Sequence, residues 1–301
     1  MKRTNLLYLI FFSLMILSCS PGEEREDTTL ETYPNEHLLL SAEDLSEQLM
    51  DEDLLLIDAR DEIEEEVIPE AINFPAVSSL ADPDHSVESF LVGPDRFQAL
   101  MREIGLNNDS RVVIYDGGNS LAAARLFYAL DYYGFSNASI LNGGLEGWKQ
   151  KGMEVEVDPV TASSGNFEVN LQENLSCDFE YIMAASEDDN KIIFDARSAE
   201  EYSGEDERAE KSGHIPNAVH LEWNTVLEPE GIPYFQSAEN IQEIFESKGI
   251  TPDKEVIPHC HTNVRGSHAY FTLRLMGYDS VRPYEGSWAE YGNRGESAVV
   301  Q

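Results

Sequence analysis

The residue best placed to do chemistry is Cys260, which ends the apolar segment 255–260 and directly precedes a helical stretch that runs to about Met276. In parallel α/β sheets, ligands bind beyond the carboxyl ends of strands. A tight strand-to-helix loop turns backbone N–H groups toward one point, and the helix N-terminus adds partial positive charge there. We therefore predict that this loop favours the nucleophilic thiolate form of Cys260, with Arg265 as a fixed cation beside it. The alternative is a small buried cysteine without a chemical role.

The elements that would position this cysteine occur twice along the chain, in the same order. In the first copy Asp116 stands where the second copy has Cys260. The helical stretches that follow end at Gly134 and Gly277, which suits a left-handed helix stop. The matched segments are 54–60 (LLLIDAR) with 191–197 (KIIFDAR), 68–71 with 215–218, 111–116 with 255–260, and 141–148 with 284–291.

The pattern of these segments predicts the fold class. Short apolar strands without alternation, interleaved with helical stretches, indicate parallel sheets that are covered on both faces. A chain of 301 residues is long enough for two domains. We therefore predict two tandem α/β domains, each a small parallel sheet flanked by helices on both faces. Their expected bounds are residues 39–156 and 176–301, joined by a linker at 157–175.

Two further motifs lie in the second copy, namely GHIPNA at 213–218 and VRPYEGSWAEY at 281–291. Together with the cysteine loop they resemble the signatures of the two-domain rhodanese family of sulfurtransferases, over about residues 39–301. This resemblance implies two rhodanese-like domains. It also implies that only the C-terminal domain is catalytic, because two-domain members usually carry Asp at the position of Asp116.

The resemblance implies a reaction as well. Cys260 would attack the outer sulfur of thiosulfate, sulfite would leave, and the persulfide would pass to cyanide or a thiol in a ping-pong cycle without metal or organic cofactor. Arg265 would hold the sulfite end of the donor, and Arg197 matches a substrate-binding arginine of the family, the alternative being an ion pair with Asp195. The residues predicted to bind the substrate are Arg197, His261, Thr262, Asn263, Val264, Arg265 and Gly266.

Some departures from the family pattern bear on the donor. The loop sequence CHTNVR differs from the loops of mercaptopyruvate sulfurtransferases and is more similar to the arginine-ending loops of some bacterial thiosulfate enzymes. Ser203 stands where mercaptopyruvate enzymes tend to have a second arginine. Asn217 replaces a signature glycine, a mild change because Asn tolerates left-handed backbone angles. Thiosulfate is the expected donor, with 3-mercaptopyruvate as the alternative.

Other functions fit the cysteine loop less well. Tyrosine phosphatases separate their cysteine and arginine by five residues, whereas four separate Cys260 from Arg265. A non-catalytic persulfide carrier or binding protein remains an alternative from a different class. Cys177 is expected to be a buried free thiol that does not form a disulfide with Cys260.

The N-terminus reads as a targeting segment. Lys2 and Arg3 precede an apolar run, 6–17, that is too short to span a hydrocarbon layer of ~30 Å. The residues ILSC at 16–19 resemble a bacterial lipobox, so we expect a lipoprotein signal peptide at 1–19, lipidation of Cys19 and an acidic tether at 20–38. The expected location is the cell envelope, anchored by lipid to the outer membrane and facing the periplasm. An ordinary signal peptide is the alternative.

The charge balance limits the partners. Fifty-seven acidic against twenty basic residues give a formal net charge of −37, which repels nucleic acid and anionic lipid headgroups. We therefore expect small-molecule sulfur donors and acceptors as partners, no nucleic acid, and membrane contact through the N-terminal lipid only. A monomer is the expected state, because the two halves can pack on each other.

Overall fold

The computed structural model describes residues 32–63 and 66–301. Cys19 and the predicted signal peptide lie outside these residues, as does the first part of the predicted tether. Within the described ranges, no helix has the length and apolar character needed to cross a membrane.

Both halves alternate strands and helices. The first half contains η1 (Glu36–Leu38), β1 (Leu39–Leu40), α1 (Ala42–Gln48), β2 (Leu54–Asp58), β3 (Ile72–Asn73), α2 (Ala76–Ser79), α3 (Pro94–Glu103), β4 (Arg111–Tyr115), α4 (Leu121–Tyr132), β5 (Ala138–Leu141) and α5 (Gly144–Gln150). The second half contains η2 (Glu173–Leu175), α6 (Phe179–Ala185), β6 (Lys191–Asp195), α7 (Ala199–Ser203), β7 (Val219–His220), η3 (Trp223–Val226), α8 (Ala238–Ser247), β8 (Glu255–His259), α9 (Val264–Leu275) and α10 (Ser287–Tyr291).

The first sheet has five parallel strands in the order β1-β5-β4-β2-β3. Its central strands, β2 and β4, are buried over four of their five residues. Helices α1 and α5 cover one face, and α2, α3 and α4 cover the other. A strand that is buried on both sides needs no polar alternation, which explains the continuous apolar runs in the sequence.

The second sheet has three parallel strands in the order β7-β6-β8. Beyond β8 the layout of the first sheet continues only as isolated parallel bridges, Val256↔Val281 and Cys177↔Tyr284. Pro258 lies in β8 and has no N–H to donate, so the ladder on this side of the strand has a gap. The two halves therefore share one topology, with its outer strands reduced in the second half.

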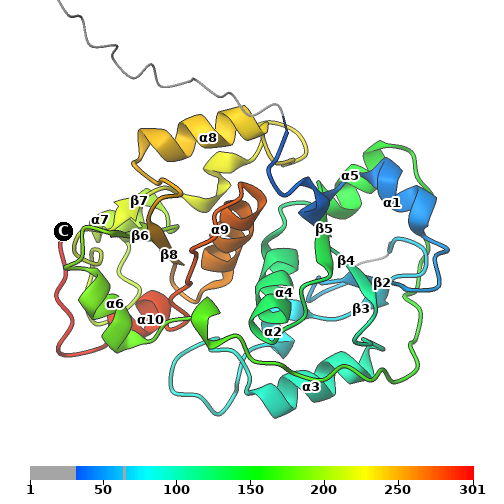
Figure 1. Ribbon diagram of the computed structural model, residues 1–301, viewed down its shortest axis with the longest axis horizontal. Helices are drawn as coiled ribbons and strands as arrows, with labels where there is room; N and C mark the ends of the chain where they lie inside the picture. Colours follow the sequence, from blue (N-terminus) through cyan, green and yellow to red (C-terminus); the bar gives the residue numbers. More distant parts are fainter. Residues whose placement is uncertain (1–31, 64–65) are drawn as a thin grey trace, which may run out of the picture.

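Helices α4 and α9 lie side by side in the middle of the molecule and join the two halves (Figure 1). One continuous core extends through them from the first sheet to the second. Within it, the rings of Phe127 and Phe271 meet edge to face with centroids 5.0 Å apart. On the second sheet, α8 shares this inner face, and α6 and α10 cover the outer face. The prediction of two parallel sheets, each flanked by helices on both faces, is confirmed.

The glycines that were predicted to stop the two long helices have left-handed angles. Gly134 has φ +91° after α4, and Gly277 has φ +78° after α9. Asn217 also has a positive φ, +62°, as its replacement of a signature glycine requires.

The segment at 157–175 is packed along the first half of the molecule. Phe167 is 1% exposed and its N–H donates to the carbonyl oxygen of Leu106. Asn170 donates in the same way to Tyr133 at the end of α4. The segment therefore connects the halves while adding to the core of the first.

Candidate active site

Cys260 directly follows β8, and α9 begins at Val264. The residue is 1% exposed and its thiol is free. Residues at the start of α10 hold its backbone. The Cys260 N–H donates to the hydroxyl of Ser287 at 3.3 Å, and its carbonyl oxygen accepts from the N–H of Trp288 at 3.0 Å. The motif at 281–291 therefore packs directly against the cysteine loop.

The equivalent loop of the first half shows what this backbone geometry binds. The Asp116 carboxylate is buried and accepts four backbone hydrogen bonds. Its donors are the N–H groups of Gly118 at 2.9 Å, Ser120 at 3.0 Å, Ala122 at 3.1 Å and Ala123 at 3.3 Å. Burial raises the pKa of Asp116, and these N–H groups oppose that shift by stabilising the anion. The strand-to-helix loop is therefore an anion-binding nest, occupied in the first half by the chain's own carboxylate.

The second half repeats the turn into its helix, with Cys260 in the place of Asp116. Both helices begin after a left-handed residue, Ser120 with φ +62° and Asn263 with φ +59°. Aligning α4 with α9 matches three of the four Asp116 donors, Ser120, Ala122 and Ala123, to the N–H groups of Asn263, Arg265 and Gly266, and the loop before Asn263 is one residue shorter than the loop before Ser120. These three amides are therefore the candidates to stabilise an anion on Cys260.

Arg265 is held by a carboxylate beside the loop. Its guanidinium makes two hydrogen bonds to Glu201 of α7, at 2.5 and 2.9 Å. Burial alone would raise the pKa of Glu201, but the hydrogen bonds and charge of Arg265 lower it to about 2. A second arginine, Arg208, lies 3.5 Å from the same carboxylate and is half exposed. The pKa of Arg265 is raised: burial lowers it, but the hydrogen bond and charge of Glu201 and the nearby Cys260 side chain outweigh that effect.

Arg197 is buried and forms the ion pair that was considered as the alternative to substrate binding. Its guanidinium contacts Asp195 at 2.6 and 2.9 Å and donates to the carbonyl oxygen of Gly213 at 2.8 Å. It also lies over the Trp288 ring, 4.3 Å from the centroid. With its side chain 1% exposed, Arg197 braces the site, and its contact with a substrate stays a prediction.

A hairpin from each half also lies over the strand-to-helix loop of the other half. The hairpin closed by the bridge Ala81↔Leu91 brings Glu88 within 3.8 Å of His261 Nε2. The hairpin closed by Leu227↔Phe235 places Tyr234 against Gly143, where an added Cβ would lie 2.3 Å from the ring. The Asp116 loop is therefore covered by the hairpin that carries Tyr234, and its anion-binding nest is occupied by the Asp116 carboxylate.

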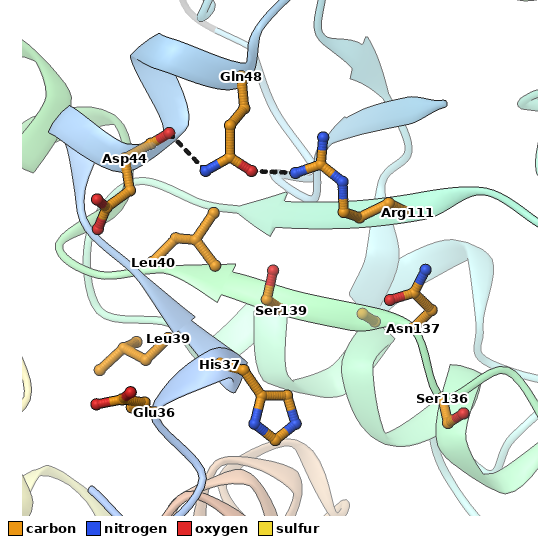
Figure 2. A pocket seen from close by; sticks show the side chains of 11 residues that line it. Glu36, His37, Leu39, Leu40, Asp44, Gln48, Arg111, Ser136, Asn137 and Ser139 are labelled. Carbon is orange, nitrogen blue, oxygen red and sulfur yellow. Dashed lines mark hydrogen bonds between the residues drawn. The ribbon is translucent and has the colours of Figure 1, made fainter. Parts of the chain in front are cut away.

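A pocket elsewhere lacks these features. It has a volume of about 560 Å³ and lies where β4 and β5 begin, the opposite end of the strands from Asp116 (Figure 2). Its arginine, Arg111, bonds to Gln48 and pairs with Asp51 at 2.7 Å. None of the predicted site residues lines it.

The structure brings most of the predicted residues to one place. Cys260 and the loop residues His261, Thr262, Asn263, Val264, Arg265 and Gly266 form the turn into α9. Sequence reasoning missed Glu201, Arg208 and Ser287. A signal for Glu201 was present, because Ser198 and Glu201 form the S-x-x-E capping box that starts α7. Cys177 is a buried free thiol, as predicted, and burial raises its pKa.

Comparison with known proteins identifies the class to which this fold and this loop belong. Residues 41–151 and 178–294 each match the rhodanese-like domain. The chain therefore belongs to the rhodanese family and carries two copies of its domain.

Its relatives include proteins of several activities. The sulfur carrier protein TtuD of Thermus thermophilus is 31% identical over 284 residues, which are 87% of this chain and 95% of that protein. The thiosulfate sulfurtransferase of Pseudomonas aeruginosa is 33% identical over 202 residues, 67% of this chain and 74% of that protein. The crystal structure of SseA from Escherichia coli, a 3-mercaptopyruvate sulfotransferase by its description, has 28% identity and a TM-score of 0.75, covering 83% of this chain and 98% of that one.

Proposed function

We propose that this protein is a thiosulfate sulfurtransferase that carries the transferred sulfur as a persulfide on Cys260. The observation that carries the proposal is the nest around Asp116, whose four N–H donors hold a buried anion. The second half repeats the left-handed turn into its helix and carries a free cysteine, Cys260, where the first half has Asp116. A persulfide anion on Cys260 would occupy the place that the carboxylate occupies in the first half.

The chemistry needs only the groups present in the loop. The Cys260 thiolate attacks the outer sulfur of thiosulfate, a new S–S bond forms, and the electron pair of the broken bond leaves with sulfite. Cyanide or a thiolate acceptor then attacks the outer sulfur of the persulfide and releases the Cys260 thiolate. The loop amides and Arg265 stabilise the negative charge throughout. No net oxidant or reductant is consumed when cyanide is the acceptor.

A small donor suits the burial of the site. Cys260 is 1% exposed, and Arg265 and His261 of the same loop have side chains that are 20% and 10% exposed. Thiosulfate is compact and dianionic, so it can reach the thiol while its sulfite end meets Arg265. Arg208 is the observation that favours 3-mercaptopyruvate as a second candidate, because it places another arginine beside Glu201.

The intact mass of the purified protein before and after thiosulfate tests the proposal. A gain of one sulfur atom in the wild type, absent in Cys260→Ala and discharged by cyanide as thiocyanate, is the expected result. Cys177→Ala is the matched control, since it removes the other described thiol and should load normally. A gain from 3-mercaptopyruvate but not from thiosulfate would replace the donor. No gain from either would refute the proposed activity.

The resemblance to a sulfur carrier protein supports a second candidate, a persulfide carrier without turnover of small molecules. The two functions separate in steady-state assays with thiosulfate and cyanide. A transferase forms thiocyanate over many cycles, whereas a carrier loads once and waits for a protein acceptor.

We also propose that the protein is exported and anchored through lipid on Cys19. The support is the N-terminal sequence, with two cations, a short apolar run and the residues ILSC at 16–19. Metabolic labelling with a fatty acid tests this, because Cys19→Ser should abolish labelling and release the protein from the membrane fraction. Labelling that survives the substitution would refute the proposed anchor.

A further inference from the structure

A buried ion pair crosses the boundary between the halves close to the cysteine loop. Arg125 of α4 contacts Glu285 at 2.7 and 3.1 Å, and their side chains are 2% and 4% exposed. The hairpin at 81–91 closes around the pair. The carbonyl oxygen of Ser89 accepts from Arg125 at 2.9 Å, and the N–H of Leu91 donates to Glu285 at 3.0 Å. The first domain thus surrounds a carboxylate that belongs to the second.

This carboxylate holds a residue of the cysteine loop. Glu285 Oε2 accepts a hydrogen bond from Asn263 Nδ2 at 2.7 Å. A second connection runs through Ser267, whose hydroxyl lies 3.5 Å from Arg125 Nη1 and donates to the Asn263 carbonyl oxygen at 2.6 Å. Both the side chain and the backbone of Asn263 are therefore linked to Arg125.

The backbone of Asn263 sets the direction of the loop as it enters α9. It is fully buried and is the left-handed residue between Cys260 and the first turn of α9. Its counterpart in the first half, Ser120, donates its N–H to the Asp116 carboxylate. A rotation about the backbone of Asn263 would move its own N–H and turn those of Arg265 and Gly266 away from the sulfur.

Among the described residues, the Asp116 side has no counterpart of this charged pair. When α4 is aligned with α9, Arg125 matches His268, and Glu285 matches Asn142 in the repeated motif. Asn142 accepts a backbone bond from Phe235 at 3.0 Å, as Glu285 does from the other hairpin. His268 is buried with neither ring nitrogen hydrogen-bonded in the described chain, and burial lowers its pKa to about 3. The Asp116 side is thus neutral at these two positions.

We propose that Arg125 and Glu285 are positioning residues for sulfur transfer, through which the first domain holds the Cys260 loop in its anion-binding conformation. The proposal rests on the proposed function of Cys260. Buried ion pairs add little net stability compared with apolar side chains, so joining the domains does not by itself account for this one. The first domain would then contribute to sulfur transfer by fixing the conformation of Asn263.

A second ion pair provides a matched control. Asp131 of α4 contacts Arg274 of α9 at 2.6 Å, so it joins the same two helices. It lies at their far ends from the cysteine loop, in the last turn of each helix. Asp131→Asn should therefore weaken the domain contact without reaching the nest.

The experiment measures how fast thiosulfate loads sulfur onto Cys260 in a single turnover of the full chain. Glu285→Gln keeps the size of the side chain and removes its charge, and should slow loading at saturating thiosulfate at least tenfold with little change in the donor concentration for half-maximal rate. Asn263→Gly keeps the left-handed backbone accessible and should slow loading to a similar degree. Because both substitutions break the same connection, the double variant with Glu285→Gln and Asn263→Gly should load no more slowly than either single variant. Asp131→Asn should load within twofold of the wild type even if its melting temperature falls.

The outcomes separate the proposal from the function on which it rests. If folded Glu285→Gln loads at the wild-type rate, or if Asp131→Asn slows loading equally, the positioning role is wrong. Should Glu285→Gln fail to fold, Asn263→Gly decides by the same measure, because it leaves the Arg125 pair intact. Failure of the wild type to load any donor would refute the function instead. Amide hydrogen exchange at 260–267 needs no donor and should still rise tenfold in Glu285→Gln but not in Asp131→Asn.

Discussion

The ion pair between Glu201 and Arg265 makes the stability of the protein depend on pH in a defined way. Glu201 is 2% exposed, and Arg265 lowers its pKa from 4.5 to about 2. One pKa unit corresponds to 1.36 kcal/mol, so ionisation of Glu201 beside Arg265 and the Ser198 N–H stabilises the folded state by about 3 kcal/mol. Because the pKa is lower in the folded protein, this stability is present above pH 4.5 and is lost as the pH falls toward 2.

Glu201→Gln isolates that contribution, because glutamine fills the same space and does not titrate. The variant should be less stable than the wild type by about 3 kcal/mol at pH 7, and the difference should shrink to about 1 kcal/mol at pH 3. Urea denaturation followed by tryptophan fluorescence at several pH values measures both. Glu200→Gln is the matched control, since Glu200 lies exposed on the same helix.

Two results would refute this reasoning. A difference between Glu201→Gln and the wild type that stays constant from pH 7 to pH 3 would mean that the carboxylate of Glu201 does not ionise against Arg265. A difference below about 1 kcal/mol at pH 7 would place the pair among ordinary surface ion pairs. An equal pH dependence in Glu200→Gln would assign the effect to the general acidity of the surface.

Three further predictions concern other parts of the molecule. Asp116→Asn offers one oxygen to four N–H donors and should lower the free energy of unfolding by about 2 kcal/mol, measured in urea; an unchanged value would contradict the nest. Cys177 has a raised pKa through burial, so iodoacetamide should alkylate it much more slowly in the native protein than in the protein unfolded in urea, as peptide mapping will show; equal rates would contradict its burial. Gly213→Ala puts a Cβ 2.1 Å from the Val300 carbonyl oxygen at φ +109° and should lower the free energy of unfolding by about 3 kcal/mol, measured by thermal unfolding. An unchanged stability would mean that the C-terminal segment around Val300 shifts to make room for the added Cβ.

The local sequence was enough to predict the class of fold and the cysteine loop. Buried parallel strands need continuous apolar residues, and helices need left-handed stops, so Gly134 and Gly277 could be recognised without a structure. The repeat then aligned Asp116 with Cys260, because a strand and the helix that follows it are close in the chain. The nest is a local structure, and its six loop residues are consecutive.

Only the tertiary structure decided what surrounds that loop. Glu201 lies 64 residues from Arg265, and Arg125 lies 160 residues from Glu285. No spacing rule connects such pairs, since their contact depends on how α4 packs against α9 and how each hairpin crosses to the other half. The ion pair of Arg197 with Asp195 is local and was foreseen as an alternative, whereas its contact with the Trp288 ring required the tertiary structure. The sequence alone predicted a cysteine in a strand-to-helix loop, and the packing of the two domains decided which charged side chains contact that loop.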